Sequence, residues 1–177
     1  MSKGVSKDFK LLDFWSWHAS DLLDNTLRGS LAEFIVAKAL GVSVPKESWS
    51  AYDIDFKEWR IEVKAAAFVQ SWSQKKDSSI SFSIRPTREW TPEDGYANEV
   101  KRHSDMYVFC LLTEKNKERT DPLVLDQWEF YPVLTSEIDK EFTTQKTVAL
   151  AALIQRLQPK KCNYESLQDT VTKMLEG

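Results

Sequence analysis

The sequence predicts an α/β, or α+β, fold with a mixed central β-sheet of about five strands flanked by helices. Two observations lead to this prediction: apolar residues recur at helical spacing toward both ends of the chain, and the middle has two-residue alternation and short apolar runs. The 177 residues suffice for one well-buried core. We therefore expect a single domain over 1–177, with its core at about 28–134, an N-terminal helical segment at 9–27 and C-terminal helices at about 147–176.

The N-terminal part of the chain is predicted to be helical. From 9 to 27, apolar residues recur at mixed three- and four-residue spacings, which is typical of one or two amphipathic helices. The residues 28–30 interrupt the pattern, and a largely buried helix is expected at 31–40, ending at Gly41. Glu33 shares its helical stripe with small and apolar residues, so its carboxylate should face the protein.

Between 49 and 67 the spacing changes to that of two β-strands. Charged residues alternate with Ile54 and Phe56 in the first arm and with Ile61 and Val63 in the second. An antiparallel hairpin is the simplest interpretation. With a two-residue loop, the expected register pairs Phe56 with Trp59, Asp55 with Arg60, Ile54 with Ile61 and Asp53 with Glu62.

Shorter signals predict the remaining elements. A nearly continuous apolar run at 105–112 indicates a central strand covered on both faces. Pro132 assigns the strand at 128–134 to a sheet edge or a bulge. We also expect a strand at 79–84, a loop at 86–95, a short helix at 96–101 and helices at 148–157 and 164–175.

Composition argues against several classes of protein. No apolar run approaches the roughly 20 residues that span a bilayer, and the first ten residues lack the apolar segment of a signal peptide. We therefore expect no membrane association and a cytoplasmic location. Cys110 and Cys162 lie far apart in the sequence and suit a reducing compartment. In the absence of a His/Cys cluster in the sequence, a structural zinc site is not expected.

The formal net charge of −3 and the pI near 5.5 argue against nucleic-acid binding by bulk electrostatics. They remain compatible with a local basic patch beside an acidic, metal-binding centre. The candidate nucleic-acid contacts are Lys75, Lys76, Arg85, Arg88 and Arg102. For each of them, ordinary solvated surface charge is the simpler interpretation.

Charged residues of the hairpin predict a metal site. Asp53, Asp55, Glu62 and Lys64 are expected on one face, and cross-strand neighbours lie about 5 Å apart. Asp53 and Glu62 would then share one cation. With the backbone carbonyl of Val63 and several waters they would form an all-oxygen site, which suits Mg²⁺ or Mn²⁺.

Two further side chains complete the predicted catalytic set. Lys64 would favour a hydroxide nucleophile or stabilise charge on a phosphate in the transition state, and Glu33 would orient the metal or the water. A solvent-exposed strand face would show the same charge alternation. The apolar run at 65–69 and the carboxylate on a buried helix favour the site, because charge is seldom buried without a partner or a task.

These residues resemble the signature of the PD-(D/E)xK nuclease superfamily, which has the restriction-endonuclease-like fold. The signature is an acidic residue at a strand end and acid-x-lysine on the next strand, often with a glutamate on the preceding helix. The matching positions are Asp53, Glu62, Lys64 and Glu33. The resemblance covers about half of the chain, from 31 to 112.

The resemblance implies a Mg²⁺- or Mn²⁺-dependent phosphodiester hydrolase of nucleic acid, and most of all a DNA endonuclease of restriction, repair or defence type. Many members have a proline before the first aspartate, where this chain has Tyr52, so Asp55 remains a second candidate there. Gln70 resembles a glutamine that some members place shortly after the lysine. Asp55 and Gln70 are therefore accessory candidates.

Two other functions remain open. A nuclease-fold protein without activity would bind nucleic acid or a protein partner, which the acidic net charge favours. An assembly protein would use its tryptophans at an interface, although they would pack equally well in a monomer core. A homodimer is compatible with cutting both strands of a duplex. The residues do not distinguish DNA from RNA, or one metal ion from two.

Overall fold

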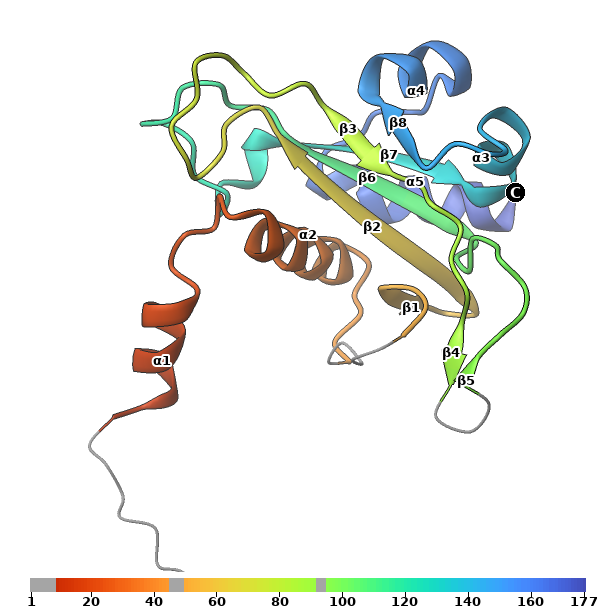
Figure 1. The fold of residues 1–177 in the computed structure, drawn as a ribbon, viewed down its shortest axis with the longest axis horizontal. Helices are drawn as coiled ribbons and strands as arrows, with labels where there is room; N and C mark the ends of the chain where they lie inside the picture. Colours follow the sequence, from red (N-terminus) through yellow and green to blue (C-terminus); the bar gives the residue numbers. More distant parts are fainter. Residues whose placement is uncertain (1–8, 45–49, 92–94) are drawn as a thin grey trace, which may run out of the picture.

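A computed structural model describes residues 9–44, 50–91 and 95–177. In these ranges the central sheet has four strands, in the spatial order β1-β2-β6-β7. They are β1 (Ile54–Phe56), β2 (Trp59–Ala67), β6 (Met106–Leu112) and β7 (Trp128–Leu134). Only β2 and β6 run parallel, so the sheet is mixed, as predicted (Figure 1).

The strand predicted at 79–84 does not join this sheet. β3 (Ser81–Ser83) pairs instead with β8 (Thr147–Ala149) in a separate two-stranded sheet. Phe82 and Ile84 are buried in the apolar cluster on one face of the central sheet. Burial therefore holds this segment above the sheet rather than at its edge, and the prediction of about five strands in one sheet is wrong.

The predicted helix at 96–101 is also wrong, and the predicted loop at 86–95, of which 92–94 lie outside the described residues, contains short strand segments. β4 (Trp90–Thr91) and β5 (Gly95–Tyr96) form an antiparallel ribbon, which is extended by a bridge between Thr87 and Lys101. Backbone amides and carbonyls of these residues form hydrogen bonds across the ribbon. In a helix they would instead bond to residues four positions away along the chain.

Helices cover both faces of the central sheet (Figure 1). The described residues contain α1 (Leu11–His18), α2 (Asn25–Ala39), α3 (Thr135–Glu141), α4 (Leu150–Leu157) and α5 (Tyr164–Glu176), and a 3₁₀ turn at Leu125–Gln127. α2 and α5 pack on one face; α3, α4, β3 and β8 lie on the other. None of the helices described is long and apolar enough to cross a membrane.

The helix break predicted at 28–30 is wrong. α2 begins at Asn25 and runs through these residues without interruption. The Asp24 carboxylate caps it by accepting hydrogen bonds from the backbone amides of Thr26 and Leu27. The two C-terminal helices are confirmed within two residues of their predicted bounds.

β6 is the centre of the core, as predicted from its apolar run. All of its residues are buried, and they alternate between two apolar clusters. Val108 and Cys110 face α2 and α5, whereas Phe109 and Leu111 face the other layer. β7, which contains Pro132, is an edge strand of the central sheet, in agreement with the prediction.

Removal of the Phe109 ring should destabilise the protein. Phe109 is fully buried, and its ring centroid lies 5.0 Å from that of Phe82. Phe109→Ala loses apolar burial and leaves a cavity, so the free energy of unfolding should fall by about 3–5 kcal/mol. Urea unfolding followed by circular dichroism measures this. Val100→Ala, at a position 56% exposed, is the control and should change stability by less than about 0.5 kcal/mol; equal losses would contradict the assigned core.

Candidate active site

The site lies where β2 continues beyond β1. Three of the four predicted pairs are present, Phe56 with Trp59, Asp55 with Arg60 and Ile54 with Ile61, whereas Asp53 and Glu62 are not a strand pair because β1 begins at Ile54. β1 begins at Ile54, and within the described ranges no strand covers this edge of β2 from Glu62 onward.

Asp53, the residue before β1, also contacts β2, through its backbone amide and its side-chain carboxylate. Its backbone amide donates to the carbonyl of Ile61 at 3.1 Å, and its carboxylate Oδ2 accepts from the amide of Val63 at 2.9 Å. The carboxylate therefore stands in for a strand carbonyl. Because the N–H and C=O of one residue in a strand point to the same edge, the Val63 carbonyl points toward Asp53 as well.

Glu62 and Lys64 flank Val63 in sequence and form an ion pair with each other. Their side chains are 18% and 29% exposed, so both are largely withdrawn from water. On the neighbouring strand, Tyr107 lies directly beside Glu62 in the parallel register. The acid-x-lysine pair is thus held between a free strand edge and the buried central strand.

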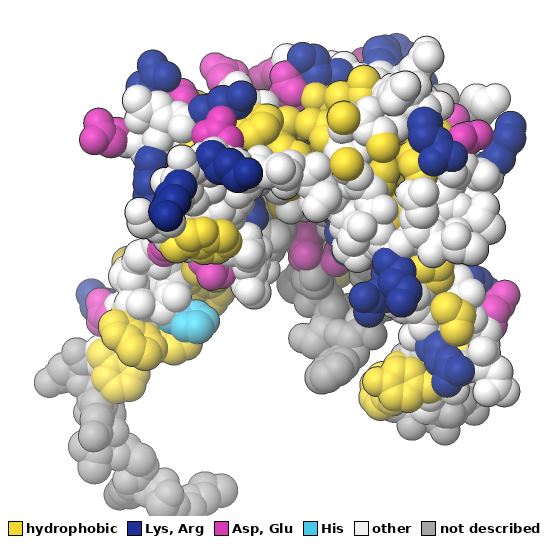
Figure 2. Space-filling model, turned by 45° about the horizontal axis from the view of Figure 1, so that its top comes forward, with side chains coloured by type: hydrophobic (Ala, Val, Ile, Leu, Met, Phe, Trp, Pro, Cys, Tyr) yellow, Lys and Arg dark blue, Asp and Glu magenta, His cyan; other side chains and the backbone are white. Residues whose placement is uncertain are grey.

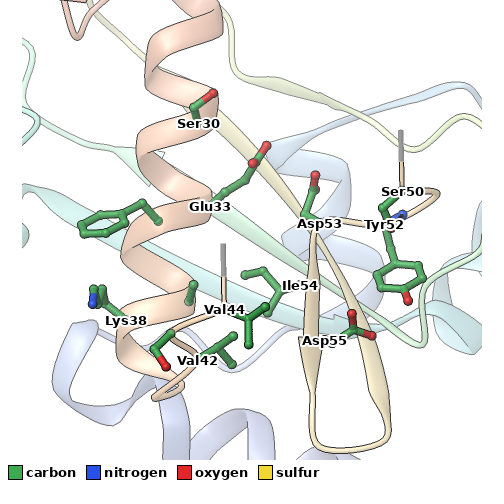
Figure 3. A pocket seen from close by; sticks show the side chains of 13 residues that line it. Ser30, Glu33, Lys38, Val42, Val44, Ser50, Tyr52, Asp53, Ile54 and Asp55 are labelled. Carbon is green, nitrogen blue, oxygen red and sulfur yellow. Dashed lines mark hydrogen bonds between the residues drawn. The ribbon is translucent and has the colours of Figure 1, made fainter. Parts of the chain in front are cut away.

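A cavity of about 430 Å³ opens beside Asp53. Figure 3 shows the carboxylates of Glu33, from α2, and Asp53 extending to the same side of this cavity, whereas the carboxylate of Asp55, which also lines it, is directed away from both. Apolar side chains line the cavity next to the two acids: Phe34, Ala37, Val42, Val44 and Ile54. The Glu33 side chain faces the protein, as its helical stripe predicted.

The electrostatics link these residues into one group. Burial raises the pKa of Glu62; the Lys64 ammonium lowers it again, and the negative charges of Asp53 and Glu33 add to the increase. The net shift is upward. Burial also raises the pKa of Tyr107 to about 12, with a contribution from Glu62. Three carboxylates and one ammonium therefore share a poorly solvated region with excess negative charge.

The donors present suit a hard cation. In the described ranges, no three His, Cys, Asp or Glu side chains come together as a metal cluster. Two carboxylates, the Val63 carbonyl and water would still give the all-oxygen environment that Mg²⁺ and Mn²⁺ prefer. The carboxylate of Asp53 is directed to this edge by its bond from the Val63 amide. A cation there would also compensate the charge that raises the pKa of Glu62.

Gln70 does not reach this cavity. Its side-chain carbonyl accepts from Arg28 at 3.1 Å, and its amide nitrogen donates to the Ala67 carbonyl at 2.9 Å and to Ser78 at 3.1 Å. Gln70 and Arg28 line a second, separate cavity. The structure therefore assigns Gln70 to the connection between α2 and the segment after β2.

The predicted nucleic-acid contacts divide into two groups. Lys75, Lys76, Arg85 and Arg88 are exposed. Arg102 is buried, and its guanidinium donates to the backbone carbonyls of Ile84, Phe142 and Gln145 and pairs with Asp139. The prediction for Arg102 is wrong, because its hydrogen-bonding groups are already used inside the protein.

Sequence reasoning missed the neighbours that support the site. Tyr107 was assigned only to the core, because its position beside Glu62 depends on parallel pairing between distant strands. The spacing pattern predicts a helix break at Arg28, which lies inside α2. The sequence Asp24-Asn25 before it could have indicated an earlier start, since Asp24 caps the helix and Asn25 accepts a hydrogen bond from Arg28.

Comparison with known proteins identifies one family. A family model described as bacteriophage T4 endonuclease IV matches residues 10–152. No curated protein and no solved structure gives a significant match. The matched region contains Glu33, Asp53, Glu62 and Lys64.

The pKa of Glu62 should respond in opposite directions to two substitutions. Without divalent metal, Asp53→Asn removes a negative charge and should lower this pKa, whereas Lys64→Met removes the ammonium and should raise it further. Carbon-13 NMR titration of the Glu62 carboxyl, assigned with Glu62→Gln, measures both. Glu114, whose pKa is lowered by backbone hydrogen bonds from Asn116 and Lys115, should move in neither variant. An unresponsive Glu62 would show that the charges do not converge.

Proposed function

Because the chain belongs to the bacteriophage T4 endonuclease IV family, which implies a phosphodiester hydrolase acting on DNA, we propose that it is a divalent-metal-dependent endonuclease of the PD-(D/E)xK type. Its catalytic residues in this proposal are Asp53, Glu62 and Lys64, assisted by Glu33. Restriction, repair and defence are the roles that suit such an activity.

One observation carries the proposal. The Asp53 carboxylate is bonded to the backbone between Glu62 and Lys64, in front of a cavity that Glu33 also lines. Lys64, Asp53 and Glu33 all affect the pKa of Glu62, at the part of β2 whose edge is open among the described residues. Charges in so little solvent are seldom retained for stability alone.

Asp53, Glu62 and the carbonyl of Val63 would hold Mg²⁺ or Mn²⁺, which supplies a Lewis acid and a source of hydroxide at neutral pH. Glu62 must be ionised to act as a ligand. Since its pKa is raised, ligation is lost as the pH falls through a value above that of an ordinary glutamate.

Lys64 and Glu33 have separate tasks in this proposal. Lys64 carries an ammonium that stabilises the negative charge building on the phosphate oxygens during hydrolysis. Its ion pair with Glu62 keeps that ammonium at the carboxylates in the free protein. Glu33 extends to the same side of the cavity as Asp53, where it is suited to accept a hydrogen bond from the attacking water and orient it (Figure 3).

A nuclease-fold protein without activity is the second candidate. It is favoured by the absence, among the residues described, of a cluster of three side chains of the metal-ligating types. In that case the chain would bind DNA or a protein partner without cleaving a phosphodiester bond. Metal binding distinguishes the two candidates.

Substitution of the acid-x-lysine pair should abolish cleavage. Glu62→Gln and Lys64→Met each remove a charge used in the transition state, so we expect losses of at least about 10³-fold in the rate of DNA cutting with Mg²⁺ or Mn²⁺. Gel assays on plasmid and single-stranded DNA measure this. Asp55→Asn, an equal change on a side chain that is directed away from Glu33 and Asp53, should stay within about threefold of the parent. Variants that cut like the parent would refute the proposed site.

Divalent metal should bind through the two carboxylates. Calorimetry with Mn²⁺ should give one or two sites per chain, and Asp53→Asn should weaken binding at least about tenfold because an anionic ligand is lost. The affinity should fall on acidification as Glu62 becomes protonated. Asp55→Asn again serves as the control. Binding that is absent from the parent, or equal in Asp53→Asn, would favour the protein without activity.

A further inference from the structure

The ribbon formed by β4 and β5 projects from the body as an arm. We define the arm as residues 85–101, of which 85–91 and 95–101 are described. Trp90 pairs with Tyr96 across the ribbon, and the Ala97 amide donates to the Glu89 carbonyl at 2.8 Å. Figure 1 shows the arm extending away from the central sheet near the ends of β1 and β2.

Buried polar side chains fix the root of the arm. Arg102 donates from Nε to the Ile84 carbonyl at 2.8 Å, and the Nε2 atom of His103 lies 2.9 Å from the Thr87 carbonyl. Both Arg102 and His103 are buried. The arm is therefore anchored at its base while its outer part extends into solvent.

The arm carries exposed aromatic and basic side chains. Trp90 is 41% exposed and Tyr96 is 71% exposed. Arg85 and Arg88 are exposed as well, and neither forms an ion pair or hydrogen bond among the described residues. Lys101 is paired with Glu99 at 2.6 Å. Two guanidinium groups thus remain available on the arm for an external anion.

The arm lies beside the candidate active site. The Arg60 guanidinium is 6.0 Å from the centroid of the Tyr52 ring, which lines the cavity. The pKa of Arg60 is raised first by its hydrogen bond to Asp105 and, among smaller charge effects, by Tyr52 and Glu89. Arg60 therefore contacts a residue of the cavity and is close enough to Glu89 of the arm to feel its charge. In Figure 2 basic and hydrophobic side chains of the arm border a hollow in which acidic side chains are visible.

We propose that the arm binds the substrate DNA beside the cleavage site, with Arg85 and Arg88 pairing with backbone phosphates and Trp90 and Tyr96 packing against nucleotides. This inference rests on the proposed function. Guanidinium groups bind phosphate in a bidentate geometry, and aromatic rings stack on nucleobases. α1 also exposes aromatic residues, but among the described residues Lys10 is the only lysine in or next to it, which makes it a poorer match to a polyanion.

Equilibrium binding of a fluorescently labelled DNA oligonucleotide, measured by anisotropy with EDTA present, tests the proposal independently of cleavage. Arg85→Gln/Arg88→Gln should weaken binding at least about tenfold and reduce the dependence of log K on log salt by about 1–2. Trp90→Ala/Tyr96→Ala should weaken binding similarly but leave the salt dependence unchanged, because stacking releases no counterions.

The matched control removes two lysines at the opposite edge of the central sheet. Lys160→Gln/Lys161→Gln changes the net charge as much as the arginine variant does. The two lysines precede Cys162, which forms a β-bridge to Phe130 in the edge strand β7. It should bind DNA like the parent. Equal weakening in the control would show that only net charge matters and would overturn the assignment to the arm.

Activity measurements distinguish a failure of the DNA-binding proposal for the arm from a failure of the proposed nuclease function. If the parent is a nuclease, arm variants should raise KM for the oligonucleotide and hydrolyse bis(p-nitrophenyl) phosphate, which is too small to reach the arm, at the parental rate. A parent that binds DNA but cleaves neither substrate would refute the proposed function and leave the arm supported by the binding data. Arm variants that bind DNA like the parent would refute the assignment of DNA binding to the arm. The same holds if the variants change only the sedimentation coefficient of the protein and not its affinity for DNA.

Discussion

The candidate site depends on a difference in length between two paired strands. β2 has nine residues and β1 has three, so the Val63 amide has no strand partner in the described structure. A buried amide left without a partner costs about 1–3 kcal/mol. The Asp53 carboxylate satisfies this amide and is thereby held at the edge of β2 beside Glu62. A backbone requirement thus positions an acid that the proposed chemistry needs.

This placement works against the stability of the metal-free fold. The raised pKa of Glu62 means that the folded state binds its proton more tightly than the unfolded state does. Ionised Glu62 therefore lowers the free energy of unfolding, and the loss develops as the pH rises from the unfolded-state pKa through the folded-state pKa. Lys64 offsets part of this effect. A cation that binds only the folded state would offset more, which couples the proposed function to stability.

The parts of the fold predicted from sequence are those encoded over short distances. The hairpin register follows from two-residue alternation around one turn, and the central strand follows from a continuous apolar run. The sheet partner of 79–84 was missed because β8 lies more than sixty residues away along the chain. The candidate site residues Asp53, Glu62 and Lys64 could be proposed from the sequence because they lie close together around that hairpin. The support from Tyr107 and the network joining Arg28 to Gln70, 42 residues apart, depend on tertiary packing that spacing does not reveal.

An acidic net charge is compatible with a DNA substrate when the positive and negative side chains lie in different places on the protein. Affinity for a polyanion depends on the field where it binds, not on the sum over the chain. The carboxylates that would repel a phosphate most are Glu33, Asp53 and Glu62, and they lie where a divalent cation would compensate them. Beside them, basic side chains of the arm border a hollow in which acidic side chains are visible (Figure 2), and Arg85 and Arg88 are exposed on the arm. The protein can therefore be acidic overall and still attract a phosphate to one place.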